Sequence, residues 1–148
     1  MTEADPNVVR QLLLELRDTN KEKRRTAVMK LGMMGGDQAV RALINTVQNN
    51  HEDLIVRGRA ALMLGKIGDI RAVEPLIRAL DAPGFQTPIH AAEALGKLGD
   101  ERAIEPLVML AASSRDKMRE TIMQALSRLG HNFNEAEPLS STPEPEIS

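Results

Sequence analysis

A leucine-glycine pair occurs four times along the chain, each time four residues after an alanine. The glycines of these pairs stand 33, 31 and 34 residues apart, at Gly32, Gly65, Gly96 and Gly130. A repeat of this period is typical of stacked supersecondary units, because one such unit cannot bury its apolar face alone. The spacing therefore predicts an array of similar units that share one continuous core.

Each unit has the pattern of two helices. The blocks GKIGD at 65–69 and GKLGD at 96–100 are nearly the same, and GMMGG at 32–36 is a degraded copy. Apolar residues follow at positions four, seven, eight and eleven after the final residue of each block, which is one face of a helix. The same template fits the start of the chain from Asp5. The pattern predicts an all-α chain of about eight helices in residues 1–133, with units at approximately 5–35, 36–68, 69–99 and 100–130.

Residues at the ends of the expected helices support this pairing. Aspartate accepts hydrogen bonds from the free N–H groups of a first helical turn, so Asp5, Asp69 and Asp100 are predicted N-caps. Glycine near the end of a helix takes a positive φ at little steric cost. We expect C-caps at the second glycine of each block, which leaves the first as a close contact between neighbouring helices; the expected caps are Gly35, Gly68 and Gly99.

Two prolines fall where a helix interior is expected. Pro75 and Pro106 stand six residues after the capping aspartates. Proline inside a helix removes one hydrogen bond and clashes with the preceding turn. We therefore expect residues 70–74 and 101–105 to form a tight lead-in, with the regular helix beginning near each proline.

Three segments of the chain resemble a known repeat family. The segments RAALMLGKIGD at 59–69, RAVEPLIRAL at 71–80 and HAAEALGKLGDERAIEPL at 90–107 look like the HEAT-like repeats first associated with phycobilisome lyases. The resemblance extends over about residues 5–130 and is specific for the fold, but not for a function. It implies a right-handed α-solenoid in which one helix of each pair lines a concave surface.

Composition and the two ends of the chain predict where the protein is located and which part of it folds. The 148 residues contain 42% hydrophobic residues and no cysteine, so a core can form without a disulfide framework. The N-terminal residues contain neither a basic region nor an apolar run, which predicts a cytoplasmic protein without a membrane segment. Residues 134–148 contain four acids, three prolines and no base, which predicts a disordered tail that is either solubilising or a short interaction segment.

The positions that carry metal ligands in related enzymes hold other residues here. Deoxyhypusine hydroxylases, which the repeats resemble, bind iron through His-Glu pairs seven and six residues before the Leu-Gly glycine. Those positions hold Arg25-Thr26, Gly58-Arg59, Ile89-His90 and Met123-Gln124. The three histidines, His51, His90 and His131, fall at different positions of the repeat and do not converge. We predict no catalytic residue, no metal and no cofactor.

Two further ligand classes are disfavoured by composition. Residues 1–133 contain 19 Lys and Arg against 17 Asp and Glu, so the expected solenoid is nearly neutral. The chain contains only two aromatic residues, Phe85 and Phe133. A nucleic-acid surface needs a basic track and stacking aromatics, and a bilin pocket is commonly lined by aromatic side chains, so we expect neither.

Protein binding remains, and the repeat register predicts its place. Positions two, five and nine after the cap point away from the core positions of the first helix of each unit. We call the predicted binding residues at these positions the first-helix ridge: Arg10, Leu14, Arg41, Asn45, Arg71, Glu74, Arg78, Arg102, Glu105 and Met109. The ridge is either an ordinary solvent face or a surface that contacts an acidic or mixed protein or peptide.

A second candidate surface is a basic cluster at the start of the expected second helix. It consists of Lys21, Lys23, Arg24 and Arg25. Cations at the beginning of a helix oppose its dipole at a small cost, which a dedicated partner would explain. The alternative is a solvated turn whose long side chains cover apolar surface with their stems.

Three classes of function fit these observations. The first is a non-enzymatic scaffold or adaptor that binds a protein through the first-helix ridge. The second is an auxiliary subunit of a phycobilin-lyase-like or deoxyhypusine-hydroxylase-like enzyme. The third is a homo-oligomeric module that stacks end to end through Leu13 or Leu14 and Met118 or Met123.

Overall fold

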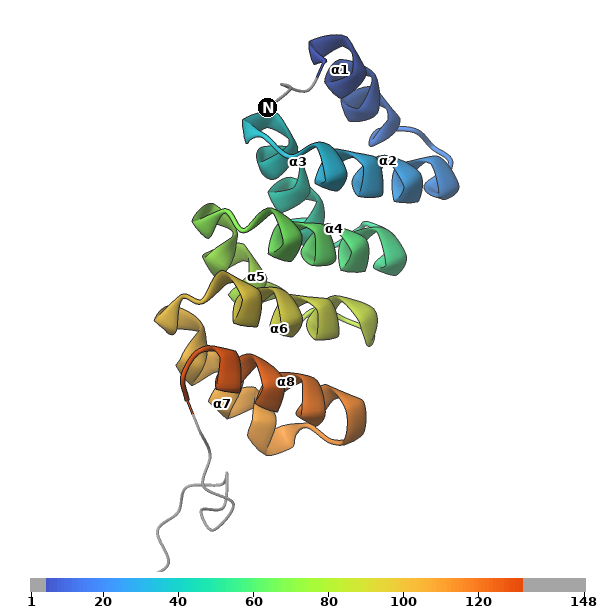
Figure 1. The fold of residues 1–148 in the computed structure, drawn as a ribbon. Helices are drawn as coiled ribbons and strands as arrows, with labels where there is room; N and C mark the ends of the chain where they lie inside the picture. The colour runs from blue at the N-terminus through green and yellow to red at the C-terminus, as the bar shows by residue number, and fades with distance from the viewer. Residues whose placement is uncertain (1–4, 132–148) are drawn as a thin grey trace, which may run out of the picture.

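The computed structural model describes residues 5–131, and the predicted acidic tail at 134–148 lies outside the described residues. Within this range the predicted all-α solenoid of about eight helices is confirmed, and none of the helices is long and apolar enough to cross a membrane. The elements are α1 (Pro6–Glu15), α2 (Lys21–Met34), α3 (Asp37–Gln48), α4 (Leu54–Ile67), η1 (Ile70–Ala72), α5 (Val73–Ala79), α6 (Gln86–Leu98), η2 (Glu101–Ala103), α7 (Ile104–Ser113) and α8 (Asp116–Arg128). Successive helix pairs stack along one direction (Figure 1).

The predicted caps are present at both ends of the helices. The carboxylates of Asp5, Asp69 and Asp100 each accept a hydrogen bond, at 2.9 Å, from the backbone N–H two residues later. Helices α2, α4 and α6 end at C-cap glycines 35, 68 and 99. Gly68 illustrates the requirement, since its φ of 79° and ψ of 20° lie in the left-handed region, which other residues adopt only with strain.

The tight lead-in before each proline is also confirmed. The 3-10 helices η1 and η2 precede α5 and α7, which begin at Val73 and Ile104. Pro75 and Pro106 are therefore third residues of α-helices, where a backbone N–H has no partner within the helix. The proline ring removes no helical hydrogen bond there, so the helices run on without interruption.

The second helices of the pairs, α2, α4, α6 and α8, form a tightly packed row (Figure 1). A Cβ atom on Gly65 would lie 2.7 Å from the Cβ of Ala94, and one on Gly96 would lie 2.8 Å from the Cα of Ala125. A Cβ on Gly32 would overlap the side chain of Met63. The first glycine of each block therefore lets adjacent second helices approach, as the repeat pattern predicts.

The hydrophobic core lies between this row and the row of first helices, α1, α3, α5 and α7. Its largest cluster runs from α2 to α8 and contains fully buried leucines in successive units, among them Leu43, Leu64, Leu95 and Leu126. A smaller cluster joins α1 to α2 and the start of α3. The first helices contact one another far less than the second helices do. The row of first helices is therefore the open side of the molecule.

Candidate interaction surface

The first-helix ridge lies on this open row, and all ten of its predicted members are exposed. The two apolar members are among the most exposed large hydrophobic residues described, with Leu14 at 60% and Met109 at 69%. Exposure of an isolated apolar side chain is common on soluble proteins. What gives the ridge a defined shape is the set of ion pairs and grooves between the first helices.

An ion pair joins α3 to the unit that follows it. The Asp69 carboxylate accepts from the backbone N–H of Arg71 at 2.9 Å and from its guanidinium at 3.1 and 2.8 Å. The same guanidinium donates to the carboxylate of Asp37 on α3 at 2.7 Å. Asp69 therefore caps η1 and orients Arg71 toward the preceding first helix.

The next unit repeats this arrangement. Asp100 accepts from the backbone N–H of Arg102 at 2.9 Å and from its guanidinium at 3.0 Å. The guanidinium then reaches Glu74 on α5 at 3.3 Å. An aspartate followed two residues later by arginine is thus the sequence signature of an ion pair between successive first helices.

These contacts change the acidity of the carboxyl groups. Hydrogen bonding from Arg71 lowers the pKa of Asp37 and of Asp69, and hydrogen bonding from Arg102 lowers the pKa of Asp100. The cause is the same in each case, because a donor with a positive charge favours the ionised carboxylate. The three aspartates are therefore negatively charged at neutral pH, and Arg71 and Arg102 are partly neutralised by their neighbours.

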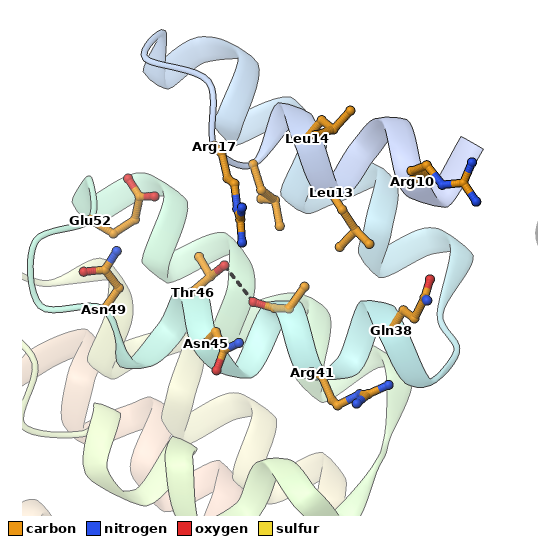
Figure 2. Close-up of a pocket in the computed structure, with 12 residues that line it drawn as sticks. Arg10, Leu13, Leu14, Arg17, Gln38, Arg41, Asn45, Thr46, Asn49 and Glu52 are labelled. Atoms are coloured by element: carbon orange, nitrogen blue, oxygen red, sulfur yellow. Dashed lines mark hydrogen bonds between the residues drawn. The ribbon is translucent and has the colours of Figure 1, made fainter. Parts of the chain in front are cut away.

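A groove of about 640 Å³ opens between α1 and α3, and Figure 2 shows its lining. Four members of the first-helix ridge line it: Arg10, Leu14, Arg41 and Asn45. The other lining residues are outside the predicted set: Leu13, Leu16, Arg17, Gln38, Ala42, Thr46, Asn49 and Glu52. The side chains of Leu13 and Arg17 point from α1 toward α3, so the groove combines apolar and charged groups (Figure 2). We call it the α1/α3 groove.

The aspartate-arginine pair of the later units is absent at this groove. In the second unit the cap position is Gly36, which has no side-chain cap bond, and Gln38 stands where Arg71 and Arg102 stand in later units. Gln38 carries no charge and lines the groove. No ion pair joins α1 to α3 in the part of the chain that the structure describes.

A second groove, of about 540 Å³, lies between α5 and α7. Three ridge members line it, and the apolar part comes from both helices: Ile77, Leu80, Asp81, Arg102, Glu105, Pro106, Met109, Leu110 and Ser113. We call it the α5/α7 groove. Its charge differs from that of the first groove, because Asp81 and Glu105 are acidic and Arg102 is already paired with Asp100 and Glu74.

Seven of the ten ridge residues line one of the two grooves, and the other three lie between them. Arg71 and Glu74 form the ion pairs described above, whereas Arg78 has no ion pair among residues 5–131. The prediction missed Leu13, Leu16, Ile77 and Leu80 as lining residues. They occupy core positions of the register, and the wide spacing of the first helices leaves them facing a groove.

In the basic cluster at the start of α2, the two arginines are mostly buried in ion pairs and the two lysines are exposed. Arg24 binds Glu52 through its Nε and Nη2 atoms at 3.1 and 3.0 Å, and Arg25 binds Asp53 through two parallel hydrogen bonds of 2.9 and 3.1 Å. Both arginine side chains are mostly buried, at 20% and 15% exposure. Lys21 and Lys23 are exposed. The two arginines thus hold α2 against the turn before α4.

Asp53 has a second structural role in this contact. Its carboxylate also caps α4 by accepting from the N–H of Val56 at 3.1 Å. The guanidinium of Arg25, and then this backbone bond, lower the pKa of Asp53 to about 2, against the opposing effect of burial. The pair raises the pKa of Arg25 in turn.

The positions that hold iron ligands in the hydroxylases lie on the second helices α2, α4, α6 and α8. Over residues 5–131, no group of three or more His, Cys, Asp and Glu side chains is arranged to hold a metal ion. His90 lies on α6, with its Nδ1 atom 3.5 Å from Glu93, and His51 is exposed in the turn after α3.

Solved structures of other proteins share this arrangement. One is a chain of the complex of CpcE and CpcF of phycocyanin lyase from Nostoc sp. PCC7120, with 26% identity and a TM-score of 0.71 over 88% of this chain and 55% of that one. The present chain thus spans about half of its length. Another is an engineered protein, with 22% identity and a TM-score of 0.63 over 83% of this chain and 62% of that one, and it supports the fold alone.

Comparison with curated proteins finds no match. Comparison with family models does, because the model of HEAT repeats matches residues 9–87 and again residues 72–127. The two matches together cover α2 to α7 completely and most of α1 and α8. The repeat register, the paired helices and these matches agree, and the chain belongs to the HEAT repeat family.

Proposed function

We propose that this protein is a non-enzymatic scaffold that binds a protein or peptide through the first-helix ridge. The observation that carries the proposal is the coincidence of the ridge with two grooves, each of which combines apolar and charged side chains. Apolar anchors surrounded by polar groups are typical of protein-binding sites. Leu14 and Met109, one in each groove, are the anchors we propose.

The row of first helices also has a suitable length for such a partner. Adjacent packed helices lie about 8–10 Å apart, so four more widely spaced first helices extend over at least about 30 Å. A standard interface covers about 800 Å² on each partner. An extended segment or a helix that crosses α1, α3, α5 and α7 would reach both grooves.

The test compares two exposed methionines on opposite rows. Full-length protein is immobilised, proteins of the source cells are captured, and the captured partner is then purified for titration. Met109→Glu should weaken the purified complex at least about tenfold, because a charge would replace a desolvated anchor. Met33→Glu, at an 81% exposed position on α2, is the matched control and should leave the affinity unchanged.

Leu14→Glu provides the same comparison for the other groove. Unchanged affinity in both Met109→Glu and Leu14→Glu would remove the ridge as the binding surface. Circular dichroism of each variant should match that of the wild type, because both side chains are exposed and contribute little to the core.

A role as an auxiliary subunit of a lyase-like enzyme is the second candidate. The observation that favours it is the 26% identity to a chain of the phycocyanin lyase complex over 88% of the present chain. That complex contains two different proteins, so a subunit of this kind would need a second chain. A visible absorption band that stays with the purified protein through gel filtration, or a co-purifying second HEAT repeat chain, would support this candidate over the scaffold.

A further inference from the structure

The α1/α3 groove carries positive charge that is not fully neutralised. Arg10 and Arg17 form no ion pair with any residue between 5 and 131, and Arg41 shares the carboxylate of Asp37 with Arg71. The one acid that lines the groove, Glu52, is held by Arg24. The groove therefore presents cations beside leucines, which suits an acidic segment that contains an apolar residue.

The chain itself contains such a segment. Residues 134–148 have four acids and no base, whereas residues 1–133 have a net charge of +2 from 19 bases and 17 acids. The sequence Glu144-Pro-Glu-Ile147 places two acids directly before an isoleucine. Proline at 143 and 145 restricts the backbone, which lowers the entropy lost when an extended segment binds.

The length of the chain decides which acids can reach the groove. Helix α8 ends at Arg128, on the edge of the array where α3 begins (Figure 1). From α7 and α8 to α1 are three inter-helix steps, or at least about 30 Å, since packed helices lie 8–10 Å apart and the first helices stand wider. The 13 residues from 131 to 144 cover about 40 Å at 3.1 Å per residue in a polyproline conformation. Glu135 and Glu137 are too near α8 to reach, and Glu144 and Glu146 are far enough along.

We propose that residues 144–147 dock into the α1/α3 groove of the same chain. Glu144 and Glu146 then face the arginines that line the groove, and Ile147 lies against its leucines. A short tether gives an effective concentration in the millimolar range, so weak contacts are sufficient for binding within one molecule. The segment would compete with an outside partner for this groove, and that consequence rests on the proposed function.

The experiment places a spin label on the segment of the full-length protein. The chain has no cysteine, so Ser141→Cys provides a unique thiol for a nitroxide. In the ¹⁵N-labelled protein, docking should broaden the backbone amide signals of α1 and the first half of α3. Arg10→Glu together with Arg17→Glu should reduce this relaxation about tenfold, because two attractive charge contacts become repulsive.

A matched variant controls for net charge. Lys30→Glu together with Lys66→Glu makes the same change of charge at exposed positions on α2 and α4, and it should leave the broadening in place. Salt at about 1 M should weaken the docking, since the Debye length then falls to about 3 Å. The amide spectrum itself reports whether each variant is folded.

Two results would overturn the proposal. One is broadening confined to α7 and α8, which would mean that the segment does not reach the groove. The other is broadening in an unlabelled ¹⁵N chain mixed with spin-labelled ¹⁴N chain, which would mean that the segment binds a second copy. Neither result changes the expected effect of Met109→Glu on partner affinity, so the failure of this proposal and that of the proposed function are distinguishable.

Discussion

The two rows of helices come from the same repeat but differ in how closely their members approach. In the second-helix row, glycine on one helix meets alanine on the next, and a Cβ atom has no room at Gly65 or Gly96. In the first-helix row, arginine and acidic side chains fill the space between helices, and two grooves remain open. One row thus supplies packing, and the other supplies a surface whose composition varies from unit to unit.

The difference also shows which side can change without loss of the fold. A side chain in the tight row is constrained by the neighbouring backbone, whereas a ridge side chain meets mostly solvent and other side chains. Variation among ridge residues should therefore have little effect on stability. This separation is what makes an array of helical pairs suitable for many different partners.

The largest expected effect on the free energy of unfolding comes from placing a valine in the second-helix row, and the same residue in the first-helix row is its control. Gly96→Val puts a branched side chain where a single Cβ would already lie 2.8 Å from the Cα of Ala125, and we expect it to lower the free energy of unfolding by about 3 kcal/mol. Asn45→Val on α3 adds a valine at an exposed position and should change it by less than about 0.5 kcal/mol. Urea denaturation followed by circular dichroism measures both. Equal effects would mean that the two rows are equally constrained.

The next largest expected loss of stability comes from breaking the ion pair between Arg25 and Asp53 in the second-helix row. Asp53→Ala removes both the cap of α4 and the partner of Arg25, and it should cost about 1–2 kcal/mol. Asp53→Asn keeps a capping side chain and should cost less. If Ala and Asn destabilise equally, the charge pair rather than the cap dominates.

The same residue predicts a dependence on pH. The folded-state pKa of Asp53 is lowered to about 2, below an ordinary value of about 4 for an unfolded chain. A lowered pKa means that the contribution is complete above the ordinary value and is lost as pH falls toward 2. Unfolding midpoints measured between about pH 5 and 2 should therefore decline less steeply in Asp53→Asn than in the wild type. A parallel decline would contradict the role of this carboxylate.

Much of this architecture could be predicted because it depends on fixed spacings within the repeat. The caps, the position of the prolines and the close contact at Gly65 each require only residues in one unit and its neighbour. The grooves depend instead on how far apart the first helices stand, and the register does not report that distance. Leu13 and Ile77, for example, occupy core positions, yet each lines a groove.

One signal in the sequence distinguishes the contact between α1 and α3 from the contacts between the later first helices. Aspartate and arginine two residues apart occur at 69 and 71 and at 100 and 102, but Gly36 and Gln38 replace them in the second unit. Because that pair joins successive first helices, its absence predicts that α1 and α3 are not joined. Arg24 and Arg25 illustrate the opposite case, since their acidic partners lie 28 residues away and no local pattern identifies them.

The smallest effect should come from the exposed ion pairs of the first-helix row. Arg71→Met with Arg102→Met removes the contacts to Asp37 and Glu74, and we expect a smaller loss of stability at low salt than in Asp53→Ala, because exposed pairs gain little over hydration. The loss should shrink further at 0.5–1 M salt, where the charges are screened over about 3–4 Å. The corresponding test in the tight row is Arg25→Met, whose partner is mostly buried, and its cost should persist in salt because a buried pair is screened less and Asp53 would be left without its cation. Denaturation midpoints of the two variants at low and high salt separate these cases. A loss of stability that does not depend on salt in either variant would mean that the ridge ion pairs contribute to the fold as much as the ion pair of Arg25 does.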